Sequence, residues 1–135
     1  MANAKLTDKQ AQLFLGRNFG ALASLYPDGS PMVTPVWVDW DGEHVLLNTL
    51  KSRSKPGQVE RDPRVEVVVV SSENPYQHVR VKGRARLVDE GAEEHIDKLS
   101  EKYVGESPYP WRQPGDERVI VEITPERVAT YNVDE

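Results

Sequence analysis

The chain has 135 residues, 17 basic and 22 acidic side chains, a formal net charge of −5 and no cysteine. This length is typical of one domain, so we expect a single unit over residues 1–135 that buries its core without a disulfide or a structural metal. Because the chain is acidic and lacks both a signal-peptide core and a long apolar run, we expect a cytoplasmic protein with no nucleic-acid partner and no membrane association.

The first half of the chain is predicted to form a short helix followed by three strands. Thr7 and Gln10 have the spacing of a capping box, so we expect a helix to begin at Thr7. Pro35 cannot donate to a β ladder, so we expect an edge, a bulge or a ligand-facing break at that position. Alternating side chains and the turn residues between them predict strands at residues 19–26, 32–40 and 44–49.

The second half is predicted to contain further strands and one longer helix. Residues 65–71 are strongly β-branched, which predicts a strand buried on both faces. Ala92, Ile96 and Leu99 form an apolar stripe, so a helix is expected over residues 91–103. The remaining elements are an alternating strand at residues 76–88 and a final hairpin at residues 119–123 and 128–131. Six or seven strands in sequential hairpins, with few helices, indicate a mainly β protein built as a small antiparallel barrel.

Positive charge is concentrated in residues 51–64, which we call the basic segment. Five basic and two acidic residues give it a net charge of +3, which leaves −8 for the rest of the chain. Arg53 and Lys55 alternate with serine hydroxyls, and Pro56 suits the first turn of a helix. Such groups at a helix N-terminus bind phosphate, although the same pattern also occurs in an ordinary solvated loop between a strand and a helix.

A second set of cations occupies every other position of the long strand: Arg80, Lys82, Arg84 and Arg86. One interpretation is a solvated face whose charges pair across the sheet with Glu66 or Glu122. The other is a basic wall for an anionic ligand, an interpretation that suits Arg80 and Lys82 better than the other two. The sequence leaves both interpretations open.

The histidines do not indicate a metal site. His44, His78 and His95 are far apart in the chain, and none has ligand spacing to another histidine or to a carboxylate. Zinc-protease, P-loop, dinucleotide-binding and serine-hydrolase motifs are absent from the sequence. Trp111, in a loop rich in proline, is the tryptophan least suited to burial in its own subunit, so we expect it to cover a flat ligand or a partner chain.

Several stretches between Leu13 and Val128 resemble one family, in order along the chain. They are GALASLYPDGSPMVTPVWVDWDG, VLLNTLKSRSKPGQVERDPRVEVVV, NPYQHVRVKGRARLV, GAEEHIDKLSEKYVG and YPWRQPGDERVIVEITPERV. With the more specific runs RDPRV at residues 61–65 and YPW at residues 109–111, the chain resembles the pyridoxamine-phosphate-oxidase-like flavin and deazaflavin oxidoreductases, most closely their small F420-dependent members. The resemblance implies an FMN-binding-type split β-barrel, built as a homodimer with two cofactor sites at its interface.

The resemblance also implies which residues meet the cofactor, which is F420 or alternatively FMN. The phosphate is expected at Arg53, Ser54 and Lys55. The ring and its ribityl chain are expected along Thr34, Pro35, Val36, Asn48 and Thr49. The other side is expected to be approached, in part from the second subunit, by Asn74, Pro75, Tyr76 and Trp111. Relatives commonly have an Arg and an Asn where this chain has Gly57 and Gln58, so one cation is missing. Gln58 takes the place of the usual Asn and is also expected to meet the cofactor.

The function implied by the resemblance is hydride transfer from reduced F420 to a planar, electron-poor acceptor such as a quinone, an enone or a tetrapyrrole. An FMN-dependent oxidoreductase and a non-catalytic flavin- or tetrapyrrole-binding protein are the alternatives. The cofactor supplies the chemistry in such proteins, and no catalytic residue is identified from the sequence. Solvent, Tyr76 or His78 would serve if a proton is needed, and Arg80 with Lys82 would suit an oligoglutamate tail of F420.

Overall fold

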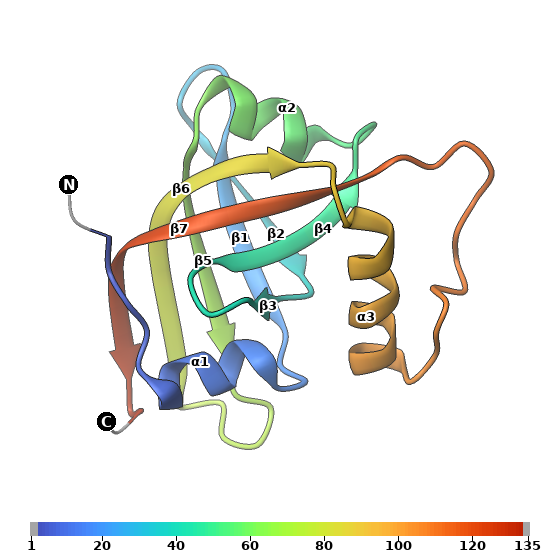
Figure 1. Ribbon diagram of the computed structural model, residues 1–135. Coiled ribbons are helices and arrows are strands. Elements are labelled where there is room, and N and C mark those ends of the chain that lie inside the picture. Colours follow the sequence, from blue (N-terminus) through green and yellow to red (C-terminus); the bar gives the residue numbers. More distant parts are fainter. Residues whose placement is uncertain (1–2, 134–135) are drawn as a thin grey trace.

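The structure, a computed structural model, describes residues 3–133 and shows a curved antiparallel sheet with three helices around it (Figure 1). The helices are α1 (Asp8–Leu15), α2 (Ser54–Arg61) and α3 (Ala92–Val104). The strands are β1 (Gly20–Leu25), β2 (Pro31–Val36), β3 (Asp39–Trp40), β4 (Val45–Leu50), β5 (Arg64–Val70), β6 (His78–Val88) and β7 (Arg118–Tyr131). The predicted mainly β, antiparallel split-barrel fold is confirmed, with seven strands in the described chain.

The order of the strands places distant parts of the chain on either side of one cavity. The sheet runs β2-β1-β5-β6-β7-β4-β3, so β2 forms one edge while β3 and β4 lie at the opposite end. β4 reaches that end by pairing with β7 rather than with its predecessors β1 and β2. Because the sheet curves, residues of β2 and β4 line the same cavity. The curvature therefore creates the site described below.

The core lies inside the curve of the sheet. Side chains of a strand alternate between its two faces, and the inward ones of β5 and β6, Val67, Val69, Val79 and Val81, are fully buried. Phe14 of α1 is equally buried in this cluster. Full burial of such a side chain contributes roughly 1.5–3 kcal/mol to stability. α1 and α2 lie at opposite ends of the barrel (Figure 1).

α3 stands beside the barrel, where the side chain of Tyr103 anchors it. The Tyr103 hydroxyl donates to the carbonyl of Asn18 at 2.6 Å and accepts from the N–H of Val38 at 3.0 Å. Trp37 stacks on the Tyr103 ring with centroids 5.0 Å apart. Burial raises the pKa of Tyr103 to about 12, so the hydroxyl stays protonated and able to donate. The predicted helix and its buried apolar stripe are confirmed.

The C-terminal region corrects one prediction. The expected hairpin at residues 119–123 and 128–131 is one continuous strand, β7, paired with β6 along its length. A register shift between Lys82 and Gly83 accommodates the Thr-Pro-Glu sequence that resembled a turn. A side chain at Gly83 would collide with the carbonyl oxygen of Thr124, so glycine allows the two backbones to approach.

Other elements differ from the predictions in detail. The strand expected at residues 32–40 is interrupted between β2 and β3, and Pro35 lies on an edge strand, which was one of its predicted settings. The prediction that residues 65–71 are buried on both faces is wrong, because burial alternates along β5. The capping box of Thr7 and Gln10 is confirmed. No helix within residues 3–133 is long and apolar enough to cross a membrane.

Candidate functional site

A cavity of about 340 Å³ opens between the two sheet edges and α3. Its lining residues are Phe19, Pro35, Val36, Trp37, Leu47, Asn48, Thr49, Arg53, Lys55, Ile96, Leu99, Tyr109, Arg118 and Val121. The lining includes six of the residues predicted to meet the cofactor: Pro35, Val36, Asn48, Thr49, Arg53 and Lys55. The structure thus brings the predicted phosphate cations and part of the predicted ring-binding strands to one cavity.

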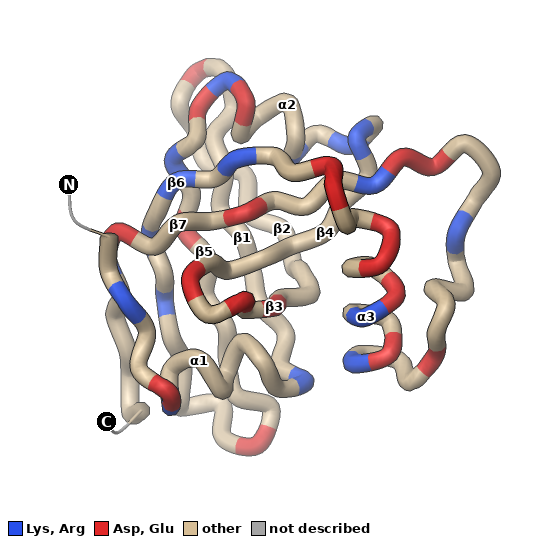
Figure 2. Tube along the Cα trace, viewed as in Figure 1, with Lys and Arg blue, Asp and Glu red and all other residues tan. Residues whose placement is uncertain are grey.

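The cavity is positively charged. Three cations, Arg53, Lys55 and Arg118, contribute to its lining, and no carboxylate does among the described residues that form it. Figure 2 shows Lys and Arg gathered at the loop that leads into α2. Burial, together with the neighbouring Arg53, lowers the pKa of Lys55, as expected where cations approach each other without a counterion. An anionic ligand would relieve this repulsion.

The start of α2 adds backbone donors to this end of the cavity. Arg53 is the N-cap residue of α2, and its side chain makes no capping hydrogen bond. The first N–H groups of a helix have no intrahelical partner, and the helix dipole favours a negative charge beside them. Arg53, Lys55 and this helix end therefore offer the kinds of donor group that a phosphate would need.

The structure places Ser54 and Gln58 against β1 and β2, outside the cavity lining. The Ser54 hydroxyl lies 3.7 Å from the sulfur of Met32. Gln58 is buried, its amide oxygen accepts a short hydrogen bond from the Ser24 hydroxyl, and its amide nitrogen lies 3.6 Å from the Met32 sulfur. Within one chain Gln58 therefore ties α2 to the sheet. Thr34 also stays outside the lining, with its hydroxyl oxygen buried and unpaired in the described structure.

The four residues expected on the other side of the ring do not line the cavity of a single chain. Asn74, Pro75 and Tyr76 belong to the loop between β5 and β6, and the Tyr76 side chain is 73% exposed. Trp111 is also exposed, but it packs edge-on against Tyr109 with ring centroids 5.6 Å apart. Tyr109 itself lines the cavity. A contact of the four residues with the cofactor stays a prediction, as does the expectation that some of them come from a second copy of the chain.

Eight of the fourteen lining residues were not predicted from the sequence, and Arg118 and Tyr109 are two of them. Arg118 begins β7, opposite Leu50 at the end of β4, and its guanidinium lies over the Tyr109 ring at 4.8 Å from the centroid. In sequence, Arg118 looks like an ordinary charge at a strand end, and Tyr109 looks like part of a flexible loop. In the structure, the Tyr109 N–H donates to the Asp97 carboxylate at 2.8 Å, which ties this part of the loop to α3.

A buried polar network supports the cavity from behind. Asn48 lies beside His95 of α3, with 3.3 Å between the amide nitrogen and Nδ1, and His95 Nε2 lies 3.1 Å from a carboxylate oxygen of Asp39. Lys98 pairs with the same carboxylate oxygen at 3.1 Å. Although burial alone would raise the pKa of Asp39, hydrogen bonds from His95, the Trp40 N–H and Lys98 lower it to about 2. Asp39 is therefore an anion at neutral pH.

The cations of β6 take part in ion pairs on the outer face of the sheet. The pairs and their distances are Arg80 with Glu66 at 3.6 Å, Arg84 with Glu126 at 3.2 Å and Arg86 with Glu122 at 2.6 Å. Lys82 lies opposite Glu66 in the register of β5 and β6. The structure supports the interpretation of this row as a solvated, paired face, and none of its members lines the cavity.

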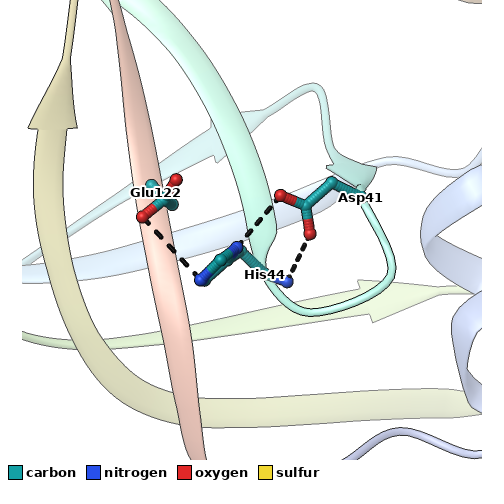
Figure 3. Close-up of side chains that lie close together, drawn as sticks. All are labelled: Asp41, His44 and Glu122. Atoms are coloured by element: carbon teal, nitrogen blue, oxygen red, sulfur yellow. Dashed lines mark hydrogen bonds and ion pairs between the residues drawn. The ribbon is translucent and has the colours of Figure 1, made fainter.

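One cluster contains a histidine and two carboxylates, residue types that can bind a metal ion, but their arrangement does not suit one ion. Asp41, His44 and Glu122 lie close together (Figure 3). Asp41 contacts Nδ1 of the imidazole at 3.0 Å, whereas Glu122 lies near Nε2 at 3.8 Å. The two carboxylates thus bind opposite nitrogens, which one ion does not bridge, and Glu122 is also paired with Arg86. We interpret the cluster as a surface charge network.

Comparisons with known proteins agree with this architecture. Residues 6–132 match the family described as pyridoxamine 5'-phosphate oxidase. A solved F420 reductase is 28% identical, with a TM-score of 0.79 over 92% of this chain and 98% of that chain. A Listeria innocua protein provisionally named pyridoxamine 5'-phosphate oxidase is 26% identical, with a TM-score of 0.64 over 84% and 88% of the two chains. General Stress Protein 26 from Bacillus anthracis shares the fold at 15% identity, with a TM-score of 0.72 and 94% of each chain covered.

Proposed function

Because this chain belongs to the pyridoxamine 5'-phosphate oxidase family of flavin- and deazaflavin-binding oxidoreductases, we propose that it is an F420-dependent reductase that delivers a hydride to a planar, electron-poor acceptor. The observation that carries the proposal is the cavity between β2 and β4, with its three cations and no lining carboxylate in the described chain. The resemblance to a solved F420 reductase at 28% identity favours the deazaflavin cofactor.

The residues present fit such a cofactor. A volume of about 340 Å³ lies within the range of small-molecule pockets, roughly 300–1,000 Å³. Val36, Leu47 and Val121 offer apolar surface for a flat ring. Arg53 and Lys55, with the start of α2, offer charge-assisted hydrogen bonds to a phosphate. Donor chemistry and shape therefore agree with a phosphorylated tricyclic ligand.

The chain itself contributes binding, orientation and the exclusion of water. When bound, the cofactor supplies the hydride chemistry. Arg53 and Lys55 hold its phosphate, and the apolar walls from β2 and β4 place the ring between the two sheet edges. Trp37 and Tyr109 close the side next to α3, where their rings meet edge-on at 6.4 Å. A planar acceptor would then stack on the ring against these walls.

We further propose that two copies of the chain complete the site. The outer face of the sheet carries an apolar patch of Ala21, Ala23, Val33 and Val68, and the Val33 side chain is 64% exposed. Loss of this apolar surface from water would favour association. Tyr76 is exposed in one chain, so its side chain is free to contact the cofactor of a partner copy, which is its expected role.

Titration of the protein with F420 and, separately, with FMN tests the cofactor assignment. We expect quenching of F420 fluorescence on binding, followed by oxidation of reduced F420 when enones, quinones or tetrapyrroles are added. Tight FMN binding with no response to F420 would contradict the proposal and favour an FMN-dependent oxidoreductase. That alternative is in line with the family description, pyridoxamine 5'-phosphate oxidase. Binding of F420 without turnover of any acceptor would instead indicate a carrier protein.

A further inference from the structure

The orientation of the Asn48 side chain is determined by its neighbours. Its amide nitrogen donates to the carbonyl of Ala92 at 2.8 Å, and its amide oxygen faces the guanidinium of Arg118 at 3.4 Å. A carbonyl only accepts and a guanidinium only donates, so the reverse orientation would place like groups against each other at both ends. Asn48 therefore directs its amide nitrogen toward α3 and its oxygen toward Arg118 in the cavity.

The protonation of His95 follows from this orientation. His95 Nδ1 lies 3.3 Å from the Asn48 amide nitrogen, which is a donor, so Nδ1 accepts and carries no proton. The imidazole proton then resides on Nε2, which lies 3.1 Å from the carboxylate of Asp39. Asp39 also accepts from the Trp40 N–H at 2.9 Å and from Lys98 at 3.1 Å. In this chain of hydrogen bonds, Asn48 therefore donates to His95 Nδ1, and His95 Nε2 donates to Asp39.

Where this network reaches the cavity, a hydrogen-bond acceptor lies next to a donor. The Asn48 oxygen accepts, and the neighbouring Arg118 donates. The contact between them is long, so the Arg118 donors and the second lone pair of the Asn48 oxygen remain available to a ligand. A ligand that matches this pair carries an N–H group beside a carbonyl oxygen in one plane, which is the edge of a cyclic imide.

We propose that Asn48 and Arg118 form a subsite for the imide edge of a planar heterocycle, and that His95 and Asp39 are positioning residues that hold the Asn48 oxygen toward it. This inference rests on the proposed function, because flavins and deazaflavins both end in such an imide ring. It places the imide edge at Arg118 and the phosphate at Arg53 and Lys55, which orients the ligand within the cavity.

Three forms of one ring test the subsite. FMN, riboflavin and riboflavin methylated at its imide nitrogen are compared by fluorescence titration, in parallel with F420, its phosphate-free ribityl deazaflavin and the N-methyl derivative of that deazaflavin. We expect methylation to weaken binding of the phosphate-free ring about tenfold, since it removes the imide N–H that would donate to the second lone pair of the Asn48 oxygen. Equal binding of the methylated and unmethylated rings would overturn the inference.

Variants separate positioning from general stability. His95→Phe cannot accept from Asn48 or donate to Asp39, so the preference for the unmethylated ring should disappear. His95→Gln keeps one acceptor and one donor at similar spacing and should restore the preference. His44→Phe, which alters the surface cluster of Asp41 and Glu122, is the matched control and should leave the preference unchanged. Nitrogen NMR of the wild type should show the proton of His95 on Nε2, and a proton on Nδ1 would overturn the inference.

The phosphate comparison keeps the two proposals apart. A phosphate-bearing ring that binds no better than its phosphate-free form contradicts the proposed phosphate site. If the phosphate strengthens binding while methylation has no effect, the proposed function stands and the imide subsite does not. If no form of either ring binds, both proposals are wrong.

Discussion

Replacement of Asp39 by Asn should destabilise the protein through the loss of one buried charge. Asp39 is 2% exposed and accepts from His95, Lys98 and the Trp40 N–H. The pKa of Asp39 falls from 3.8 to about 2 on folding, and each pKa unit corresponds to about 1.4 kcal/mol. Asn has the shape of the protonated acid, so Asp39→Asn should lower the free energy of unfolding by about 2 kcal/mol at pH 7.

The same reasoning predicts how this difference changes with pH. The pKa of Asp39 is lowered by folding, so its stabilising contribution is present above pH 3.8 and is lost as the pH falls toward 2. The difference between wild type and Asp39→Asn should therefore shrink to about a third of its neutral-pH value near pH 2.5. Urea unfolding of both proteins, followed by circular dichroism between pH 7 and pH 2.5, measures it.

Asp62 provides the matched control. Its pKa is also lowered to about 2, through hydrogen bonds and an ion pair with Arg64, but its surroundings are solvent-exposed. Surface pairs contribute little because water and salt screen them, so Asp62→Asn should cost far less stability than Asp39→Asn. Equal costs for the two variants, or a cost at Asp39 that does not change down to pH 2.5, would refute the argument from burial.

Three further predictions concern binding, backbone packing and assembly. Arg53→Ala and Lys55→Ala should each weaken binding of the phosphate-bearing cofactor by about 1–3 kcal/mol, measured by fluorescence titration, and unchanged affinity in both would remove the phosphate assignment. Gly83→Ala should destabilise the protein because its new methyl group meets the β7 backbone, whereas Gly57→Ala, in open space on α2, should stabilise it by roughly 0.5–1 kcal/mol in chemical denaturation. Val33→Asp should convert a dimer to a monomer in light scattering and weaken cofactor binding, whereas a wild-type protein that is monomeric with full affinity would contradict the proposed assembly.

The secondary structure could be predicted wherever a short repeat of side chains encoded it. Alternation along residues 76–88 predicted a strand, which the structure forms as β6 from His78 to Val88, and the stripe of Ala92, Ile96 and Leu99 predicted α3. The prediction failed at β7, because the Thr-Pro-Glu sequence that resembled a turn instead accommodates a register shift against β6. Whether such a sequence forms a turn or a register shift depends on the partner strand, which the local sequence does not specify.

The candidate site was predicted only in part. Residues that are close along the chain were predicted together, whereas contacts between distant residues were not. Arg53 and Lys55 are close neighbours in the basic segment, so the hypothesis that both bind a phosphate could be drawn from the sequence, and the structure places both in the cavity lining. Gln58 was predicted to meet the cofactor because it stands where relatives commonly have an Asn, but in the structure its side chain turns toward Ser24. A helical segment of eight residues presents all its faces, and the sequence does not say which face meets the cavity.

By itself the sequence determined the alternating strands, the helix starts and the cluster of positive charge, since each depends on side chains that are neighbours along the chain. Only the tertiary structure decided that Asn48 meets His95 across 47 residues, that His95 meets Asp39 across 56, and that Arg118 meets Asn48 across 70. These contacts exist because β4 pairs with β7 and because the curved sheet brings its two edges to one cavity. Strand order and curvature result from packing of the whole core, which no local pattern encodes.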